Sequence, residues 1–425
     1  RILVVDGKRL DARDASHMAF SAMFSHVIML LIGGFSIAAA LTKHSIAKIV
    51  ASSISLKCGN GIRTVLLVNQ MIATVASMWI SNVAAPVLCY SLVSPVLKAA
   101  TAERSRAKFG TSQFEQADHD HRLCRAVVMG IALASNVGGM ASPISSPQNL
   151  FAIEYTPIGW IAWFTVSIPL CIILNIMIWV WLIWCFELPS AESAAVAWAL
   201  QRESHSGSAD EPFTYEQYFV IIVSVGTVLL WCGSVALSDF TGEMGVLGIV
   251  PFILFFGTGI LSKEDLNNFL WNVVILAMGG LVLGDAIKCS GLLDVMAEYI
   301  AHFIEDNSLS LWETLCIFSS LILICTTFVS HTVGAIVVLP IAHAVGVRMD
   351  EASGNGGGDH AKELVFAGAL ACSAAMGLPV SGFPNMTAVG IEDATGNRFL
   401  TTKDFITIAV PASLFALLVL VTIAY

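Results

Sequence analysis

The sequence predicts an all-α integral membrane protein built from two inverted repeats, each with a re-entrant helical hairpin and a broken helix. Of the 425 residues, 56% are hydrophobic and 12% are charged, and the mean hydropathy is +0.79. A soluble protein of this length could not bury so much apolar surface, so the long apolar runs are predicted to span a membrane. Polar, glycine-rich breaks interrupt two of these runs near Ser81 and Ser330. A longer break follows each of them, at 134–149 and at 372–385. Broken helices at matching places in two halves are typical of secondary transporters.

The apolar runs give the order of the predicted spans. A polar stretch at 187–214 is interpreted as a cytosolic linker between a first repeat at 1–186 and a second at 215–425. Two spans precede the Gly-Gly helix of the second repeat, whereas only sixteen residues precede its counterpart. We therefore expect the full protein to carry further N-terminal spans. The predicted full spans are 17–41, 157–186, 215–237, 246–262, 269–288 and 404–425.

Three sequence blocks recur in the same order in the two halves. Apolar segments resemble one another in general, but that alone does not explain why glycine, serine, proline and asparagine positions are paired. The repeat is therefore interpreted as structural. The paired blocks are 27–34 with 273–280, the breaks at Ser81 and Ser330, and 130–135 with 368–373.

The segments 63–98 and 312–347 are predicted to be re-entrant hairpins. The arm expected at 85–97 has thirteen residues, and a full span needs about 20. The segments 122–155 and 362–390 are predicted to be the broken helices. Non-helical backbone at membrane depth is tolerated only where it is buried in protein or lines a cavity. The hairpin tips and the helix breaks are therefore predicted to meet in the protein interior.

Lysine and arginine counts orient the two repeats. The loop expected at 98–125 is basic and is predicted to be cytosolic, whereas 348–362 is acidic and is placed outside. The two hairpins would then enter the membrane from opposite faces, as inverted repeats require. Lys8, Arg9 and Arg13 fit this orientation poorly, because they would lie outside.

The predicted site combines helix ends with hydroxyl groups. Helix N-termini suit an anion, and unwound carbonyls suit a small cation. Ser77 and Ser81 are four residues apart, as are Thr326 and Ser330, so each pair shares a helix face. The alternative is that these hydroxyls bond back to their own helices. Because the same pair recurs at both tips, it is interpreted as part of an ion site.

His331 is the ionisable residue in the two tips. A histidine at membrane depth indicates function, since it can add positive charge for a multivalent anion or sense protons. A purely structural hydrogen bond is the alternative.

Other polar residues are interpreted more simply. Asp285 and Lys288 are predicted to form a local ion pair, and His119, Asp120 and His121 are interpreted as a chance cluster in a solvated loop. The ten cysteines have no CxxC pair and are interpreted as small core residues rather than as disulfides or metal ligands.

The motifs at these breaks resemble the divalent anion/sodium symporter family, whose hairpin tips carry a Ser-Asn-Thr signature. The tips here read Ser81-Asn82-Val83 and Ser330-His331-Thr332. The strings MWISNVAAPVLCYS, ASNVGGMASPISSPQN and MGLPVSGFPNMTAVG are most similar to the fungal low-affinity phosphate transporters. The resemblance runs from about residue 17 to the end of the chain. It implies an elevator-type transporter with scaffold and transport domains, a homodimer surrounded by membrane lipids, and an N-terminal SPX domain that this sequence lacks.

The same resemblance implies roles for individual residues. No cofactor is expected, but sodium ions are expected as coupling ions. One sodium site would use Ser77, Ser81, Asn82 and Gly138, and a second would use Thr326, Ser330, His331, Ser373 and Gly377. The substrate would be held by Ser81, Asn82, Ser142, Pro143, Ser330, His331, Thr332 and Pro379.

Two departures from the family pattern favour inorganic phosphate over a dicarboxylate as the substrate. Val83 lacks a hydroxyl that carboxylate carriers use, and His331 replaces an amide, which puts the second sodium site in question. A sodium-coupled di- or tricarboxylate transporter and an anion channel remain the alternatives. An enzyme is not expected, because the sequence has no His-Glu-x-x-His, and no nucleic-acid partner is expected. Coupling to sodium or to protons, and the plasma membrane or an acidic organelle such as the vacuole, are left open.

Overall fold

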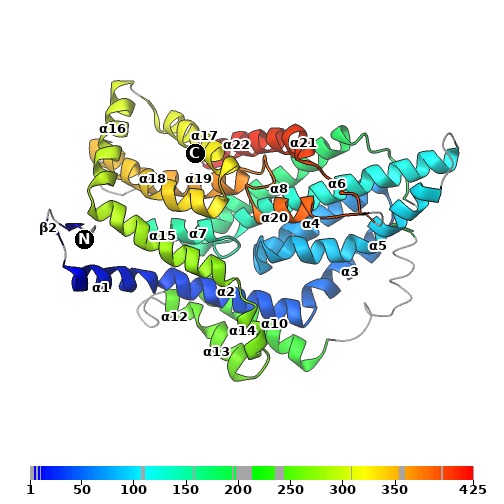
Figure 1. Cartoon of the computed structure of the whole chain (residues 1–425), viewed down its shortest axis with the longest axis horizontal. Coiled ribbons are helices and arrows are strands. Elements are labelled where there is room, and N and C mark those ends of the chain that lie inside the picture. The colour runs from blue at the N-terminus through cyan, green and yellow to red at the C-terminus, as the bar shows by residue number, and fades with distance from the viewer. Residues whose placement is uncertain are drawn as a thin grey trace.

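A computed structural model shows a predominantly helical molecule in which long helices run roughly along one axis (Figure 1). It describes residues 4–5, 8–9, 11–106, 111–156, 158–193, 196–197, 213–234, 244–307, 309–353, 359–393 and 396–424. The expected linker at 187–214 lies largely outside the described residues.

The described elements follow in chain order. The two short strands are β1 (Val4–Val5) and β2 (Lys8–Arg9), which pair antiparallel. The helices of the first half are α1 (Ala12–Met23), α2 (His26–Lys43), α3 (Ile46–Cys58), α4 (Ile62–Ile80), α5 (Ala84–Arg106), α6 (Ser112–Ala141), α7 (Pro147–Tyr155) and α8 (Trp160–Cys185). Those of the second half are α10 (Tyr215–Cys232), α12 (Met244–Gly248), α13 (Val250–Gly257), α14 (Lys263–Asn267), α15 (Trp271–Cys289), α16 (Leu292–Asp306), α17 (Leu311–Phe328), α18 (His331–Ser353), α19 (Asp359–Ala374), α20 (Phe383–Val389), α21 (Thr402–Asp404), the π-helix η1 (Phe405–Ala409) and α22 (Val410–Ala424).

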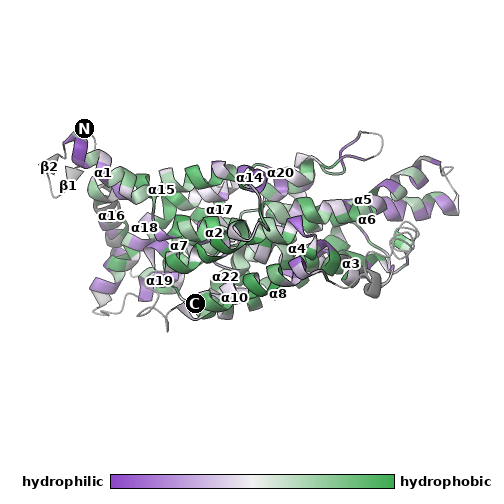
Figure 2. Ribbon diagram, turned by 90° about the horizontal axis from the view of Figure 1, so that it is seen from below, coloured by the Kyte–Doolittle hydropathy of each residue, from purple (hydrophilic) through white to green (hydrophobic). Residues whose placement is uncertain are grey.

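Within the described ranges, nine helical segments are long and apolar enough to cross a membrane. Hydrophobic residues cover the middle of the molecule, and hydrophilic residues gather near the N-terminus and at the far ends of α5 and α6 (Figure 2). Many large apolar side chains on this middle part are exposed, including Ile161, Ile222 and Leu418. A surface of this kind is stable when lipid covers it.

One predicted span is divided in the structure. The span expected at 246–262 is instead two short helices, α12 and α13, whose apolar run of 245–257 is too short to cross a bilayer. Its first part packs closely on α2, where a Cβ on Gly33 would overlap the carbonyl of Gly248. The span expected at 17–41 lies within a single membrane-length segment, 12–43, in which a turn at Phe24 and Ser25 separates α1 from α2.

The basic loop expected at 98–125 is largely helical, so that prediction is wrong. α5 continues to Arg106 and α6 begins at Ser112, which also makes the second arm of the first hairpin longer than thirteen residues. Ion pairs join the two extended ends, with Asp118 3.2 Å from both Arg104 and Arg122. The length of this arm therefore no longer argues for a re-entrant hairpin at 63–98. That the hairpin is re-entrant stays a prediction.

The cluster at 119–121 lies on α6 rather than in a solvated loop. Asp120 is 1% exposed, and the His119 ring lies 2.9 Å from the Arg122 guanidinium. Among the described residues, no group of three or more histidines, cysteines or acids is placed to hold a metal ion.

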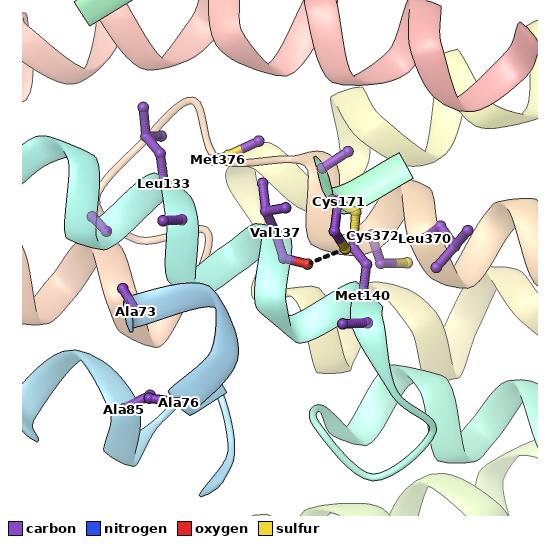
Figure 3. Close-up of a cluster of buried hydrophobic side chains, with 14 of the residues drawn as sticks. Ala73, Ala76, Ala85, Leu133, Val137, Met140, Cys171, Leu370, Cys372 and Met376 are labelled. Carbon is purple, nitrogen blue, oxygen red and sulfur yellow. Dashed lines mark hydrogen bonds between the residues drawn. The ribbon is translucent and has the colours of Figure 1, made fainter. Parts of the chain in front are cut away.

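The core surrounds α6, which is buried along nearly all of its second half. Ala73 of α4 lies on the side toward α6, whereas Ala76 lies beside Ala85 of α5 (Figure 3). The Cys171 thiol donates to the Val137 carbonyl across 3.2 Å, and Cys372 lies in the same cluster. These cysteines act as small core residues.

Candidate functional site

The first hairpin tip turns between α4 and α5 at Ser81–Val83. The Asn82 N–H donates to the Ser145 carbonyl across 3.0 Å, and the Val83 N–H donates to Ser81 Oγ across 3.3 Å. Ser81 has φ +116°, a left-handed value that is rare for a non-glycine residue. Such backbone costs about 1–3 kcal/mol and is typical of functional sites.

The second tip, between α17 and α18, makes an equivalent main-chain contact and a similar bond to its serine hydroxyl, shifted by one residue. The His331 N–H donates to the Ser381 carbonyl across 3.0 Å, and the Val333 N–H donates to Ser330 Oγ across 3.3 Å. Each tip is therefore tied to a serine in the break of the helix that follows it.

An asparagine holds each helix break in the same way. Asn149, the third residue of α7, donates through Nδ2 to the carbonyls of Gly139 and Ser142, both across 2.8 Å. Asn385, the third residue of α20, donates to the carbonyls of Met376 and Leu378 across 2.8 and 2.9 Å. These bonds satisfy carbonyls that the interrupted helices leave without a partner.

The two broken helices also bond to each other. Asn136 on α6 donates to Asn385 Oδ1 across 2.8 Å, and Gln148 on α7 donates to Ser373 Oγ across 2.6 Å. Both bonds are buried, and each joins the first half of the chain to the second. The breaks thus form one polar centre inside an apolar bundle.

Several oxygens in this centre have no hydrogen-bond partner in the protein. All belong to buried side chains of the first half of the chain. An acceptor oxygen buried without a donor is costly, so these atoms indicate a place for a cation or for a ligand that donates hydrogen bonds. They are Asn82 Oδ1, Ser135 Oγ, Asn136 Oδ1, Gln148 Oε1 and Asn149 Oδ1.

The hydroxyls predicted to form ion sites have different partners. The Ser77 hydroxyl donates to the Ser135 carbonyl across 2.7 Å and so ties α4 to α6. The Thr326 hydroxyl donates to Ile322 of its own helix across 2.6 Å, which is the back-bonding alternative that the sequence left open. The Ser142 hydroxyl donates to the Met78 carbonyl across 2.8 Å.

His331 is buried, and its Nε2 lies 2.8 Å from the Ala375 carbonyl. Because a carbonyl only accepts, Nε2 carries a proton and donates this bond. This is a hydrogen bond of the structural kind that the sequence left open.

The remaining predicted residues lie at or beside the two breaks. Pro143 and Thr332 are buried, and Pro379 is half-buried in the second break. Gly377 packs against Val410, where a Cβ would lie 2.9 Å from Cγ2. Gly138 faces α4 so closely that a Cβ would overlap the Thr74 carbonyl.

Gly138→Ala should therefore destabilise the contact between α6 and α4. Overpacking of this kind costs about 1–3 kcal/mol, and we expect a lower midpoint of thermal unfolding in detergent. Gly226→Ala on α10 is the matched control, because a Cβ there meets nothing within 4 Å. Equal midpoints for the two variants would contradict the close approach.

Sequence reasoning did not single out the residues that hold the breaks together. Asn136, Gln148, Asn149 and Asn385 lie within or beside the quoted motifs, but their partners are distant in the chain. The available signal was a proline at the start of each second half-helix followed within two residues by asparagine, at Pro147 and Pro384.

A separate cavity of about 440 Å³ lies among α1, α2, α7, α15 and α18. It is lined by ionisable residues that include Glu154, Asp285 and His343. The side chain of Lys288, which was predicted to pair with Asp285, lies outside the described residues.

A bundle of membrane-length apolar helices with two bonded helix breaks at its polar centre defines a helical membrane transporter. Residues 2–371 match the family model of the citrate transporters, CitMHS, and the chain belongs to this family.

Relatives named as transporters are similar in sequence, and one solved structure shares the fold. The chain is 44% identical over 420 residues to a transporter of Schizosaccharomyces pombe and 39% identical over 423 residues to the inorganic phosphate transporter PHO87 of Saccharomyces cerevisiae. These alignments cover 98% and 99% of this chain but only 44% and 42% of the relatives, so the chain spans less than half of their length. The chain is also similar to the solved structure of MtrF from Neisseria gonorrhoeae, described as one of a class of antimetabolite efflux pumps. The match has a TM-score of 0.54 and 12% identity, and it covers 97% of this chain and 83% of MtrF, which shows a shared fold.

Proposed function

We propose that this protein is a secondary active transporter that carries inorganic phosphate across a membrane. The observation that carries the proposal is the matched pair of hairpin tips, each bonded through a backbone N–H to the break of a broken helix. A site of this form can close from either side when the tips and breaks move together, which is what alternating access requires.

The polar centre suits an anion beside a cation. The N-termini of α5 and α18 lie at the hairpin tips, and that of α7 lies at the first break. Helix N-termini favour negative charge. Ser142, Pro143 and Thr332 lie beside these helix ends and are proposed to contact the substrate. The unpartnered oxygens around Asn82 are proposed to hold the coupling cation.

Phosphate is favoured over citrate as the substrate. The S. cerevisiae relative is named an inorganic phosphate transporter, whereas the family model is named for citrate. Val83 removes one hydroxyl from the first tip, which disfavours a carboxylate. A di- or tricarboxylate transporter is the second candidate because of the family name.

We further propose that the two halves are inverted repeats and that the joined breaks move as the transport domain of an elevator, in a homodimer of the plasma membrane or vacuole. The bonds from Asn136 and Gln148 to the second half support joint movement.

The purified protein in proteoliposomes should take up labelled phosphate in a saturable way and show counterflow, because substrate must be bound before the site changes sides. Succinate and citrate serve as competitors, and sodium and pH are varied separately. Good transport of succinate without phosphate would reverse the substrate assignment. Flux that does not saturate and shows no counterflow would indicate a channel instead.

A labelling experiment tests the inverted repeat. Cysteines at Arg106 and Glu351, exposed residues at the ends of α5 and α18, should react with an impermeant maleimide from opposite sides of the membrane. The background carries Cys325→Ser, because Cys325 is the exposed native cysteine among those described. Reaction of both sites from one side alone would rule out the inversion.

A further inference from the structure

The two hairpin tips share one backbone contact but differ at two side chains, Asn82 against His331 and Val83 against Thr332. Asn82 and His331 are 249 positions apart, and each donates its N–H to a serine carbonyl across 3.0 Å. The two serines, Ser145 and Ser381, are 236 positions apart, the same spacing as Asn149 and Asn385. Asn82 and His331 therefore occupy equivalent places in the two halves.

The first tip leaves oxygens without donors. Asn82 is 5% exposed and its Oδ1 has no partner, and the hydroxyl of the fully buried Ser135 has none either. The Asn82 amide lies against α6 at Gly139, where a Cβ would be 3.2 Å from Nδ2. Buried oxygen ligands of this kind suit a hard monovalent cation, which offers charge without requiring a hydrogen bond of fixed direction.

The second tip supplies a donor where the first leaves an acceptor. The imidazole of His331 is 3% exposed and donates from Nε2 to the Ala375 carbonyl across 2.8 Å. Its ring fills the space beside the second break, since a Cβ on Gly382 would lie 2.7 Å from Cε1. The three hydroxyls expected here all have partners: Thr326 donates to its own helix, Ser330 Oγ accepts from the Val333 N–H, and Ser373 Oγ accepts from Gln148. The Ala375 carbonyl is thus satisfied by His331 of the protein itself.

We propose that the protein binds a single coupling cation, at the first tip, and that the N–H of His331 stands in the place of a second one. This inference rests on the proposed cation-coupled transport and specifies its stoichiometry. The fixed donor performs the structural work of a cation at the second tip, which is to hold the tip against the helix break, without being bound or released in the transport cycle.

His331→Asn removes the donor and adds an amide oxygen, so the second tip acquires the acceptors of the first. The probe is labelled sodium bound to the purified full chain at saturation, without phosphate. We expect about one sodium per chain in the wild type and about two in His331→Asn. The matched control is His343→Asn, a histidine twelve positions further along α18 that lines the separate cavity, and it should remain at one.

Gel filtration and thermal unfolding establish that each variant is folded, and Asn82→Ala should lose the single sodium. Two sodium ions in the wild type, none in the wild type, or one in a folded His331→Asn would each overturn the proposal. A second measurement, the Hill coefficient of sodium-driven uptake, should rise from about 1 toward 2 in His331→Asn. The substrate assignment is tested separately, because sodium binding is measured without phosphate.

Discussion

Asn149→Ala should abolish transport and strongly destabilise the fold. Its Nδ2 donates to two carbonyls, those of Gly139 and Ser142, which lie in the buried break between α6 and α7. The hydroxyls of Ser145 and Ser146 also donate to these carbonyls, so removing the amide costs two hydrogen bonds, each worth about 0.5–1.5 kcal/mol net. We expect a fall of several degrees in the midpoint of thermal unfolding, together with loss of phosphate uptake.

Asn69→Ala is the matched control for this experiment. Asn69 is half-buried on α4 and donates only to Val65 of its own helix, across 2.8 Å. It should therefore keep its stability and its uptake. Asn385→Ala should behave like Asn149→Ala, since Asn385 holds the second break in the same way. A stable, active Asn149→Ala would show that the break does not depend on this amide.

Asn82→Ala should lower phosphate uptake by at least about tenfold at every pH while the protein remains folded. The tip is held by the backbone N–H of Asn82, which the substitution retains. Only the amide is lost, and with it the unpartnered Oδ1. An interaction with a charged group is worth about 1.5–3 kcal/mol, which corresponds to roughly ten- to a hundredfold in apparent affinity.

Ser91→Ala on the same hairpin provides the comparison, because its exposed hydroxyl bonds only to Leu88 of α5. Ser81→Ala should resemble Asn82→Ala, since Ser81 Oγ accepts from the Val83 N–H at the turn. Uptake equal to the wild type in Asn82→Ala, at saturating and at low sodium, would remove Asn82 from the site.

Breaks in apolar runs were the most informative part of the sequence. Ser81 and Ser330 stand between helices, as predicted, because serine and asparagine in an apolar run compete with the helix for backbone hydrogen bonds. The first break, predicted at 134–149, begins only after Ala141, and the second, predicted at 372–385, begins after Ala374. Local chemistry therefore located both breaks but not the residue at which each helix ends.

Sequence reasoning failed where distant contacts decide the structure. Hydropathy alone did not show that the run at 246–262 is divided, although Pro251 stands at the start of α13 and Gly248 packs against Leu30 of α2. It also did not show that the ends of α5 and α6 continue as helices, where Arg104 pairs with Asp118. The bond between Asn136 and Asn385 joins residues that no local pattern connects.

That bond also has a consequence for how the protein is made. Asn136 emerges from the ribosome 249 residues before its partner, and Gln148 emerges 225 residues before Ser373. At about 5–20 residues per second, the first broken helix exists for on the order of ten seconds to a minute before Asn385 and Ser373 are made. During this time Asn136 can bond only to Ala132 of its own helix. The translocon must therefore either release this polar helix into lipid before its partners exist or keep it out of lipid until they are made. Nascent chains halted before Asn385 should accordingly be the ones that quality-control proteases recognise.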